Sequence, residues 1–258
     1  MTKIKKGEIV ARISHGKDIL FVVDRIIDES IVILKGLTLR IEADANLKDL
    51  VIVTKEEIKN QMKIIESKGK EILKKKFFNR SIITNGKILH LDGDKNYAVK
   101  SYNHYKEMGL NAIVKNISER EQPKYIMQLL SKYKPDIIVI TGHDGMLKRI
   151  SKNDSLENYR NSKYFVNSTR VARKVQPDLV IFAGACQSYF EEIMLAGANF
   201  ASSPGRVLID YIDPLVVAEK VAITDDDRFV SINQIAPVLR EGRLGVGGIG
   251  SKGKRKKT

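Results

Sequence analysis

In two segments of the sequence, an apolar stretch is followed closely by a residue whose side chain can take part in catalysis. Residues 134–145 read KPDIIVITGHDG, and residues 176–187 read QPDLVIFAGACQ. Each opens with Pro-Asp, continues as an apolar strand and stops at a glycine, after which one delivers His143 and the other Cys186. If the strands are parallel neighbours, both side chains emerge at one edge of the sheet, where ligands bind in such folds.

A cysteine beside a histidine is the arrangement of a thiol peptidase. The thiolate is the nucleophile, so the pKa of Cys186 has to fall below its ordinary value of about 8.5. We expect Cys186 to begin a helix, whose N–H groups and dipole favour negative charge, and His143 to protonate the leaving amine. The backbone N–H of Cys186, with that of Asp144 or Gly145, is predicted to form the oxyanion hole.

Each of the two residues also has a plainer interpretation. A lone cysteine is usually a small buried hydrophobe, and a lone histidine is usually a hydrogen-bonded structural or surface residue. Their occurrence together, at equivalent strand ends, favours catalysis. The neighbouring glycines, among them Gly142 and Gly184, are expected to leave room for a substrate backbone.

Further polar residues are candidates for substrate binding. Asp92, Asp94 and Asp144 lie at predicted strand ends, where one of them can line an acidic pocket that selects arginine or lysine, although caps and turns are the commoner use of aspartate. Ser202 and Ser203 belong to a small, Gly/Pro-punctuated segment that fits a wall of the substrate site and a tight turn equally well.

The elements expected to position these residues alternate between strand and helix from about residue 78. Strands are predicted at 87–91, 111–114, 137–141, 179–183, 199–202 and 206–209, and helices at 97–108, 122–133, 161–174 and 187–196. Apolar strands that alternate with helices indicate an α/β domain with a parallel or mixed sheet covered on both faces.

The rest of the chain is predicted to form smaller parts. Residues 1–54 contain about five short strands, predicted at 8–13, 19–26, 31–34, 37–41 and 50–53, which favours a small SH3-like β-barrel. Residues 55–77 have apolar residues at helical spacing and are predicted to be a linking helix. Residues 78–242 would form the peptidase domain, and the Gly-rich, basic residues 243–258 a flexible tail.

Composition narrows the class of protein. The chain has 258 residues, 43% of them hydrophobic and 29% charged, as in an ordinary globular protein. Membrane association is not expected, since no run of about 18 apolar residues occurs and no apolar h-region follows the N-terminus. A single cysteine suits a reducing cytoplasm.

No cofactor or metal is expected. Phosphate-loop and dinucleotide fingerprints do not occur in the sequence. The run Asp225-Asp226-Asp227 lacks the alternating spacing of a calcium loop and reads as a solvated turn.

The two strand ends resemble those of caspase-type peptidases. In that family an apolar strand ends at a histidine followed by glycine, and a second strand ends at Ala-Cys roughly 50 residues later; here the separation is 43 residues. Asp144 intervenes between His143 and the next glycine, and the residues flanking Ala185-Cys186 differ from the usual Gln and Arg or Gly.

Four longer stretches carry a closer resemblance. They are residues 141–145 (TGHDG), 158–165 (NYRNSKYF), 182–190 (FAGACQSYF) and 196–206 (AGANFASSPGR). These stretches, and the β-rich N-terminal segment, resemble the sporulation-specific protease family YabG. The resemblance implies a protease in the mother-cell cytoplasm of an endospore-forming bacterium, or associated with the spore coat, that trims spore coat and related spore proteins.

Two other functions compete with the peptidase. A nucleic-acid-binding protein is supported by the predicted barrel, the basic tail and the net charge of +14, although no aromatic stacking motif for single-stranded RNA is present. The lysines are also spread widely enough to be a solvated surface. A scaffold that holds coat precursors without cutting them would require the Cys/His pair to be incidental.

Overall fold

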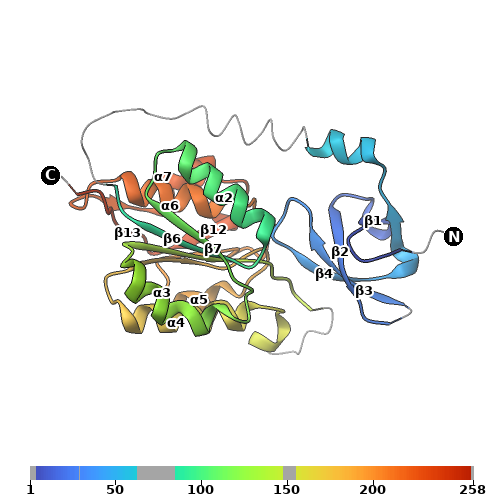
Figure 1. Cartoon of the computed structure of the whole chain (residues 1–258), viewed down its shortest axis with the longest axis horizontal. Helices are drawn as coiled ribbons and strands as arrows, with labels where there is room; N and C mark the ends of the chain where they lie inside the picture. Colours follow the sequence, from blue (N-terminus) through green and yellow to red (C-terminus); the bar gives the residue numbers. More distant parts are fainter. Residues whose placement is uncertain (1–3, 29, 63–84, 148–154, 257–258) are drawn as a thin grey trace. The chain divides into compact units, whose positions relative to one another are not determined.

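The structure is a computed structural model that describes residues 4–28, 30–62, 85–147 and 155–256. The chain divides into two compact units, the N-terminal unit (residues 1–79) and the C-terminal unit (residues 80–258) (Figure 1). Residues 55–62, the first part of the predicted linking helix, are helical, and residues 63–77 of that prediction lie outside the described residues.

The N-terminal unit is built on a five-stranded antiparallel sheet with the order β4-β3-β2-β1-β5. Its strands are β1 (Ile9–Arg12), β2 (Leu20–Ile26), β3 (Ile31–Gly36), β4 (Glu42–Asn46) and β5 (Leu50–Ile52). The prediction of short strands is confirmed. Of the predicted SH3-like barrel, the strand pairings of the described residues establish an antiparallel sheet.

One strand of this unit differs from the prediction. Residues 37–41 were expected to be extended, but the strand that pairs with β3 is Glu42–Asn46. Leu39 and Ile41 are buried in the connection before it. Cross-strand pairing therefore overrides the low β-propensity of the Glu-Ala-Asp-Ala-Asn sequence.

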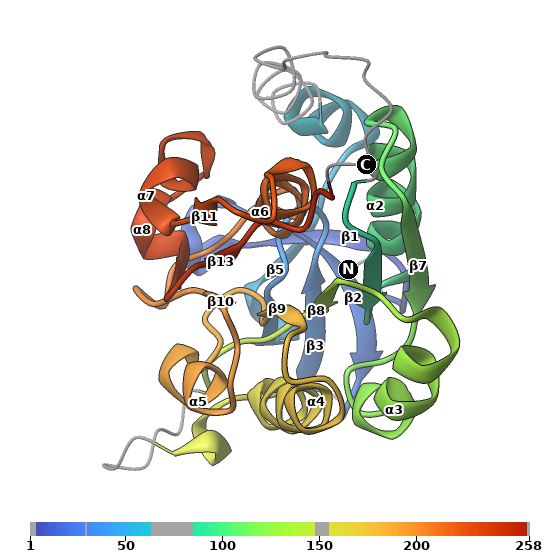
Figure 2. The same ribbon diagram turned by 90° about the vertical axis from the view of Figure 1, so that its left-hand side faces the viewer.

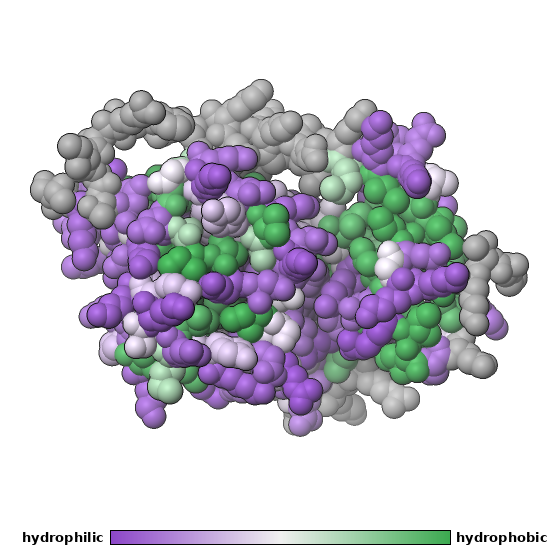
Figure 3. Space-filling view, viewed as in Figure 1, coloured by the Kyte–Doolittle hydropathy of each residue, from purple (hydrophilic) through white to green (hydrophobic). Residues whose placement is uncertain are grey.

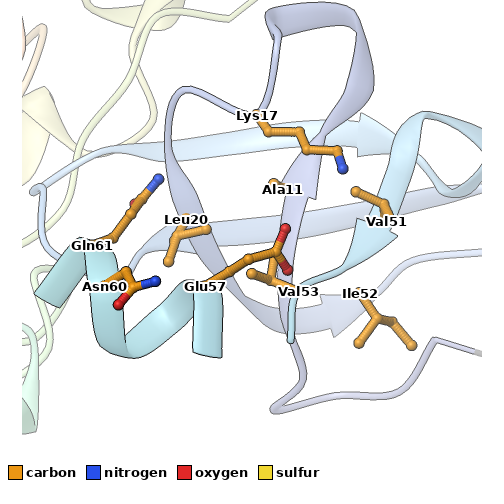
Figure 4. A pocket seen from close by; sticks show the side chains of 9 residues that line it. All are labelled: Ala11, Lys17, Leu20, Val51, Ile52, Val53, Glu57, Asn60 and Gln61. Carbon is orange, nitrogen blue, oxygen red and sulfur yellow. The ribbon is translucent and has the colours of Figure 1, made fainter. Parts of the chain in front are cut away.

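The surface of the N-terminal unit has an apolar region and a small pocket. Apolar side chains gather over this unit in Figure 3, and its exposed apolar residues include Ile13, Ile26, Ile27, Ile31 and Ile52. A pocket of about 240 Å³ opens between the sheet and the helical residues 55–62 (Figure 4). Its lining residues are Ala11, Lys17, Leu20, Val51, Ile52, Val53, Glu57, Asn60 and Gln61.

The C-terminal unit contains a six-stranded sheet with the order β12-β10-β9-β8-β6-β7. The strands are β6 (Ile88–Asp92), β7 (Ala112–Asn116), β8 (Ile137–Thr141), β9 (Val180–Ala183), β10 (Phe200–Ser202) and β12 (Val246–Gly248). Neighbouring strands are parallel except β12, which is antiparallel to β10. Every residue of β6, β8, β9 and β10 is buried, as expected for a sheet covered on both faces.

Helices cover the two faces of this sheet (Figures 1 and 2). One face carries α2 (Lys95–Glu107) and α6 (Asp213–Ile223), and the other carries α3 (Gln122–Tyr133), α4 (Ser162–Val175) and α5 (Phe190–Leu195). Short helices α7 (Ile232–Ile235) and α8 (Gly242–Gly245) precede β12. In the part of the chain that the structure describes, no helix has the length and apolar composition needed to cross a bilayer.

Residues 243–256, which the sequence assigned to a flexible tail, contribute regular structure instead. After α8 and β12, the strand β13 (Ser251–Lys252) pairs with β11 (Phe229–Val230) in a small antiparallel sheet. Two of the basic side chains form hydrogen bonds to the rest of the unit: Lys254 Nζ donates to the Asp178 carbonyl at 2.9 Å, and Arg255 Nε to Asp225 Oδ1 at 2.6 Å.

The glycines of this segment explain the difference from the prediction. A Cβ on Gly248 would lie 2.3 Å from the Asn199 carbonyl oxygen, and one on Gly253 would lie 2.1 Å from that of Thr224. These glycines permit close approach of two backbones rather than disorder.

Candidate active site

His143 and Cys186 follow neighbouring parallel strands. The register of β8 and β9 pairs Ile140 with Ala183, and the Gly184 N–H donates to the Ile140 carbonyl at 3.0 Å. Each candidate residue therefore lies three positions beyond the same strand pair, at the carboxyl edge of the sheet. Both are fully buried.

The sulfur of Cys186 is held by the backbone of a later segment rather than by a helix. The Ile209 N–H donates to Cys186 Sγ at 3.2 Å, and the thiol lies 3.5 Å from the Ile209 carbonyl oxygen. The expectation that Cys186 begins a helix is wrong, because α5 starts at Phe190 and Gln187 adopts a left-handed φ of 57°. The backbone N–H that reaches the sulfur is that of Ile209.

We call residues 206–211 the covering segment, because it crosses Cys186. It was predicted to contain a strand, but the Val207 carbonyl accepts hydrogen bonds from the Gln187 N–H at 3.2 Å and the Ser203 hydroxyl at 2.6 Å. Ser203 and Arg206 also have left-handed φ values, 66° and 55°. Backbone strain of this kind clusters at functional sites, where the surrounding structure enforces it.

Arg206 anchors the start of the covering segment. Its guanidinium lies over the rings of Tyr159 and Tyr189, 5.6 Å and 5.3 Å from their centroids. Nε donates to the Tyr159 hydroxyl at 2.9 Å, and Nη2 pairs with Glu191 at 2.5 Å. The two rings stack on each other with centroids 4.9 Å apart.

Side chains on both sides fix the peptide of His143. Its N–H donates to Glu119 Oε1 at 2.7 Å, and its carbonyl accepts from Asn161 Nδ2 at 2.8 Å. The imidazole lies beside the Tyr97 ring, 5.6 Å between centroids. Tyr211, at the end of the covering segment, stacks against the same Tyr97 ring, with 5.7 Å between centroids.

Asp144 connects the loop after β8, which contains His143, to the loop after β9, which contains Cys186. We call them the histidine loop and the cysteine loop. Its buried carboxylate accepts four hydrogen bonds, from the N–H groups of Gly145 and Asn161 and from the hydroxyls of Ser162 and Ser188. Burial raises the pKa of Asp144 to about 6, although these hydrogen bonds oppose the shift. Because all four donors belong to the protein, the hydrogen bonds of this carboxylate hold the two loops together as a brace.

Asp92 and Asp94 serve turns and caps. Asp94 is the N-cap of α2, where Oδ1 accepts from the N–H groups of Asn96 at 2.7 Å and Tyr97 at 3.1 Å. Asp92 is fully buried. Its oxygens accept from the Asp94 N–H at 2.9 Å and the Thr141 hydroxyl at 3.1 Å.

Ser202 and Ser203 line the cysteine loop. The hydroxyl of Ser203 accepts from the Gln187 N–H at 3.0 Å. The backbone N–H of Ser203 donates to the Gly245 carbonyl at 2.6 Å. A Cβ on Gly184, which has φ 112°, would lie 3.1 Å from the Cβ of Ser202. Gly184 therefore makes room for Ser202 rather than for a substrate.

Glu119 was missed by the sequence analysis. It lies between β7 and α3, at the edge of the sheet that also carries His143 and Cys186. The available signal was an acidic residue just beyond the end of a strand, which the carboxyl-edge rule would have flagged. No group of three or more His, Cys, Asp and Glu side chains that could hold a metal occurs among the described residues.

Comparison with known proteins decides the family. The family model of YabG peptidase U57 matches residues 5–258. This chain belongs to the YabG peptidase family. A curated relative, the sporulation-specific protease YabG of Bacillus subtilis (strain 168), is 38% identical over 277 residues, which cover 96% of this chain and 94% of the relative. No solved structure matches the chain.

Membership of the YabG family confirms the resemblance that the four sequence stretches carried. It makes the chain a peptidase of a sporulation protease family. The stretches map onto the site described above: TGHDG contains His143, FAGACQSYF contains Cys186, and the last stretch ends at Arg206 of the covering segment.

Proposed function

We propose that this YabG peptidase is a cysteine endopeptidase with Cys186 as nucleophile and His143 as acid and base. The observation that carries the proposal is the matched position of the two residues, three places beyond paired residues of adjacent parallel strands. The Ile209 N–H, 3.2 Å from Cys186 Sγ, supports a thiolate by donating to it.

The reaction follows from these groups. The Cys186 thiolate adds to the scissile carbonyl, and the resulting oxyanion is stabilised by the Cys186 N–H together with a second backbone N–H. His143 protonates the amine as the C–N bond breaks, which leaves a thioester. A water molecule, deprotonated by His143, then hydrolyses the thioester and regenerates the thiol.

The second oxyanion donor is best assigned to Asp144. The alternative, the Gly145 N–H, already donates to Asp144 Oδ1 at 2.9 Å, and it would have to give up that bond. Because Cys186 and His143 are fully buried, the covering segment has to move before a substrate reaches the sulfur.

The substrates we propose are spore coat and related spore proteins, in the mother-cell cytoplasm or at the coat. Support comes from the curated relative, which is named a sporulation-specific protease. We further propose that the C-terminal unit is a caspase-like core and that the N-terminal sheet is of the SH3-like kind, in keeping with the mixed and antiparallel sheets described above.

The test is to incubate the wild type, Cys186→Ala and His143→Ala with a coat-protein extract and to identify new termini by mass spectrometry. We expect new termini with the wild type and none with either variant. His15→Ala, at an exposed histidine of the N-terminal unit, is the matched control and should cut normally. Cleavage by a folded Cys186→Ala protein would rule out this mechanism.

Nucleic-acid binding is the alternative function, and the net charge of +14 is the observation that favours it. The basic C-terminal residues are weaker support than the sequence suggested, because Lys254 and Arg255 contact Asp178 and Asp225. Binding to RNA that weakens steeply with salt would support this function, and salt-insensitive or undetectable binding would remove it.

A further inference from the structure

Glu119 holds the peptide of the candidate catalytic histidine. The ladder of β8 ends at Thr141, so His143 lies beyond the hydrogen bonds that fix the strand. Its N–H is instead bound by Glu119 Oε1 at 2.7 Å. A carboxylate forms shorter and stronger bonds to an N–H than a neutral oxygen does, and 2.7 Å is at the short end of the range for such a bond.

Two glycines shape the space that the Glu119 carboxylate fills. A Cβ built on Gly142 would lie 2.2 Å from Glu119 Oε1, and a Cβ built on Gly93 would also lie 2.2 Å from that atom. The Gly93 N–H donates to the Thr141 carbonyl at 3.0 Å, which binds its loop to the end of β8. A side chain at either residue would therefore displace the carboxylate from this position.

We propose that Glu119 is a positioning residue of the peptidase, which acts by fixing the backbone of His143 and thereby the place of the imidazole relative to Cys186. This inference rests on the proposed Cys186/His143 mechanism. Glu119 itself touches neither the sulfur nor the scissile bond in this role. Misplacing a catalytic group by about 1 Å can cost on the order of 10²-fold in rate.

Cys186 provides a readout that needs no known substrate. It is the one cysteine in the 258 residues, so iodoacetamide modifies a single thiol, and intact mass counts the product. The rate itself also depends on how often the covering segment opens, because Cys186 is buried. Since the thiolate is the reacting species, the pH midpoint of the rate reports how well the imidazole stabilises it. A folded protein that loses this partner should alkylate with a profile shifted to higher pH.

Three substitutions separate positioning from charge. Glu119→Ala should shift the alkylation profile upward, toward that of His143→Ala, and slow cleavage of a coat-protein extract on the order of 10²-fold. Glu119→Gln keeps an oxygen acceptor for the His143 N–H and should keep the wild-type profile, with cleavage within about tenfold. Glu121→Gln, which loses a surface pair with Lys124, is the control and should change neither.

A double variant separates positioning from packing. Gly142→Ala alone should be destabilised by its collision with Glu119. In Glu119→Ala/Gly142→Ala the new methyl group occupies space that the carboxylate has vacated, since the three atoms nearest to a Cβ at 142 all belong to Glu119. We expect the double variant to recover thermal stability but to keep the shifted alkylation profile and the slow cleavage.

The outcomes distinguish this inference from the mechanism on which it rests. A wild-type alkylation profile and wild-type cleavage in Glu119→Ala, or recovery of both in the double variant, would overturn the positioning role. If His143→Ala alkylates as the wild type does, or if Cys186→Ala still cuts, the dyad itself fails whatever Glu119 does.

Discussion

The buried carboxyl of Asp144 makes the stability of the C-terminal unit depend on pH. Burial raises its pKa from 3.8 to about 6, so the native state binds this proton more tightly than the unfolded chain does. The contribution to the unfolding free energy is level below pH 3.8, falls as pH rises through the interval, and is level again above pH 6. The total fall is about 3 kcal/mol.

Asp144→Asn removes this titration while keeping the size of the side chain. Of the total fall in the unfolding free energy that Asp144 causes, about 2 kcal/mol occurs between roughly pH 4.5 and 7.5. Over that range we expect the variant to gain about 2 kcal/mol relative to the wild type. The cost of hydrogen bonds that an amide cannot accept is the same at every pH and does not affect the slope. Asp213, whose pKa burial and Asp210 raise to about 7, titrates in both proteins.

The assay is urea denaturation followed by the near-ultraviolet circular dichroism of tyrosine. The chain has no tryptophan, and its nine tyrosines lie between residues 97 and 211, so the signal reports the C-terminal unit. Asp226→Asn, at an exposed carboxylate, controls for the loss of one charge. A free-energy difference between Asp144→Asn and the wild type that stays constant across this pH range would refute the reasoning.

Two further substitutions test the brace and the C-terminal segment. Ser188→Ala deprives the Ala185 N–H of its acceptor and Asp144 of a donor; it should lower the unfolding free energy by about 1–3 kcal/mol in the same assay, and an unchanged midpoint would contradict the brace. Gly253→Ala places a Cβ 2.1 Å from the Thr224 carbonyl oxygen; it should destabilise by about 1–3 kcal/mol, whereas a flexible tail would tolerate it.

The arrangement of strands was within reach of the sequence. Apolar runs that open with Pro-Asp and close with Gly predicted two strands of a parallel sheet with His143 and Cys186 at one edge. Whether the strands are neighbours was left open, and the register of β8 and β9 shows that they are. This succeeded because a strand buried on both faces is a local and continuous signal.

Contacts between segments distant in the chain were out of reach. The left-handed φ of Gln187 keeps Cys186 out of a helix, and the N–H that reaches its sulfur comes from Ile209, 23 residues later. Gly142 and Gly184 were interpreted as space for a substrate, but the space belongs to Glu119 and Ser202. A glycine in the sequence indicates that another group packs closely against the backbone, but it does not identify that group.

The late position of β12 bears on how such a peptidase is made in a cell. The Ser203 N–H, beside the cysteine loop, donates to the Gly245 carbonyl, and β12 then closes the edge of β10. A nascent chain that has emerged only as far as α6 carries both His143 and Cys186 but lacks these partners. Because folding during synthesis proceeds from the N-terminus, the candidate site stays incomplete until β12, which follows both His143 and Cys186 in the chain, has been made.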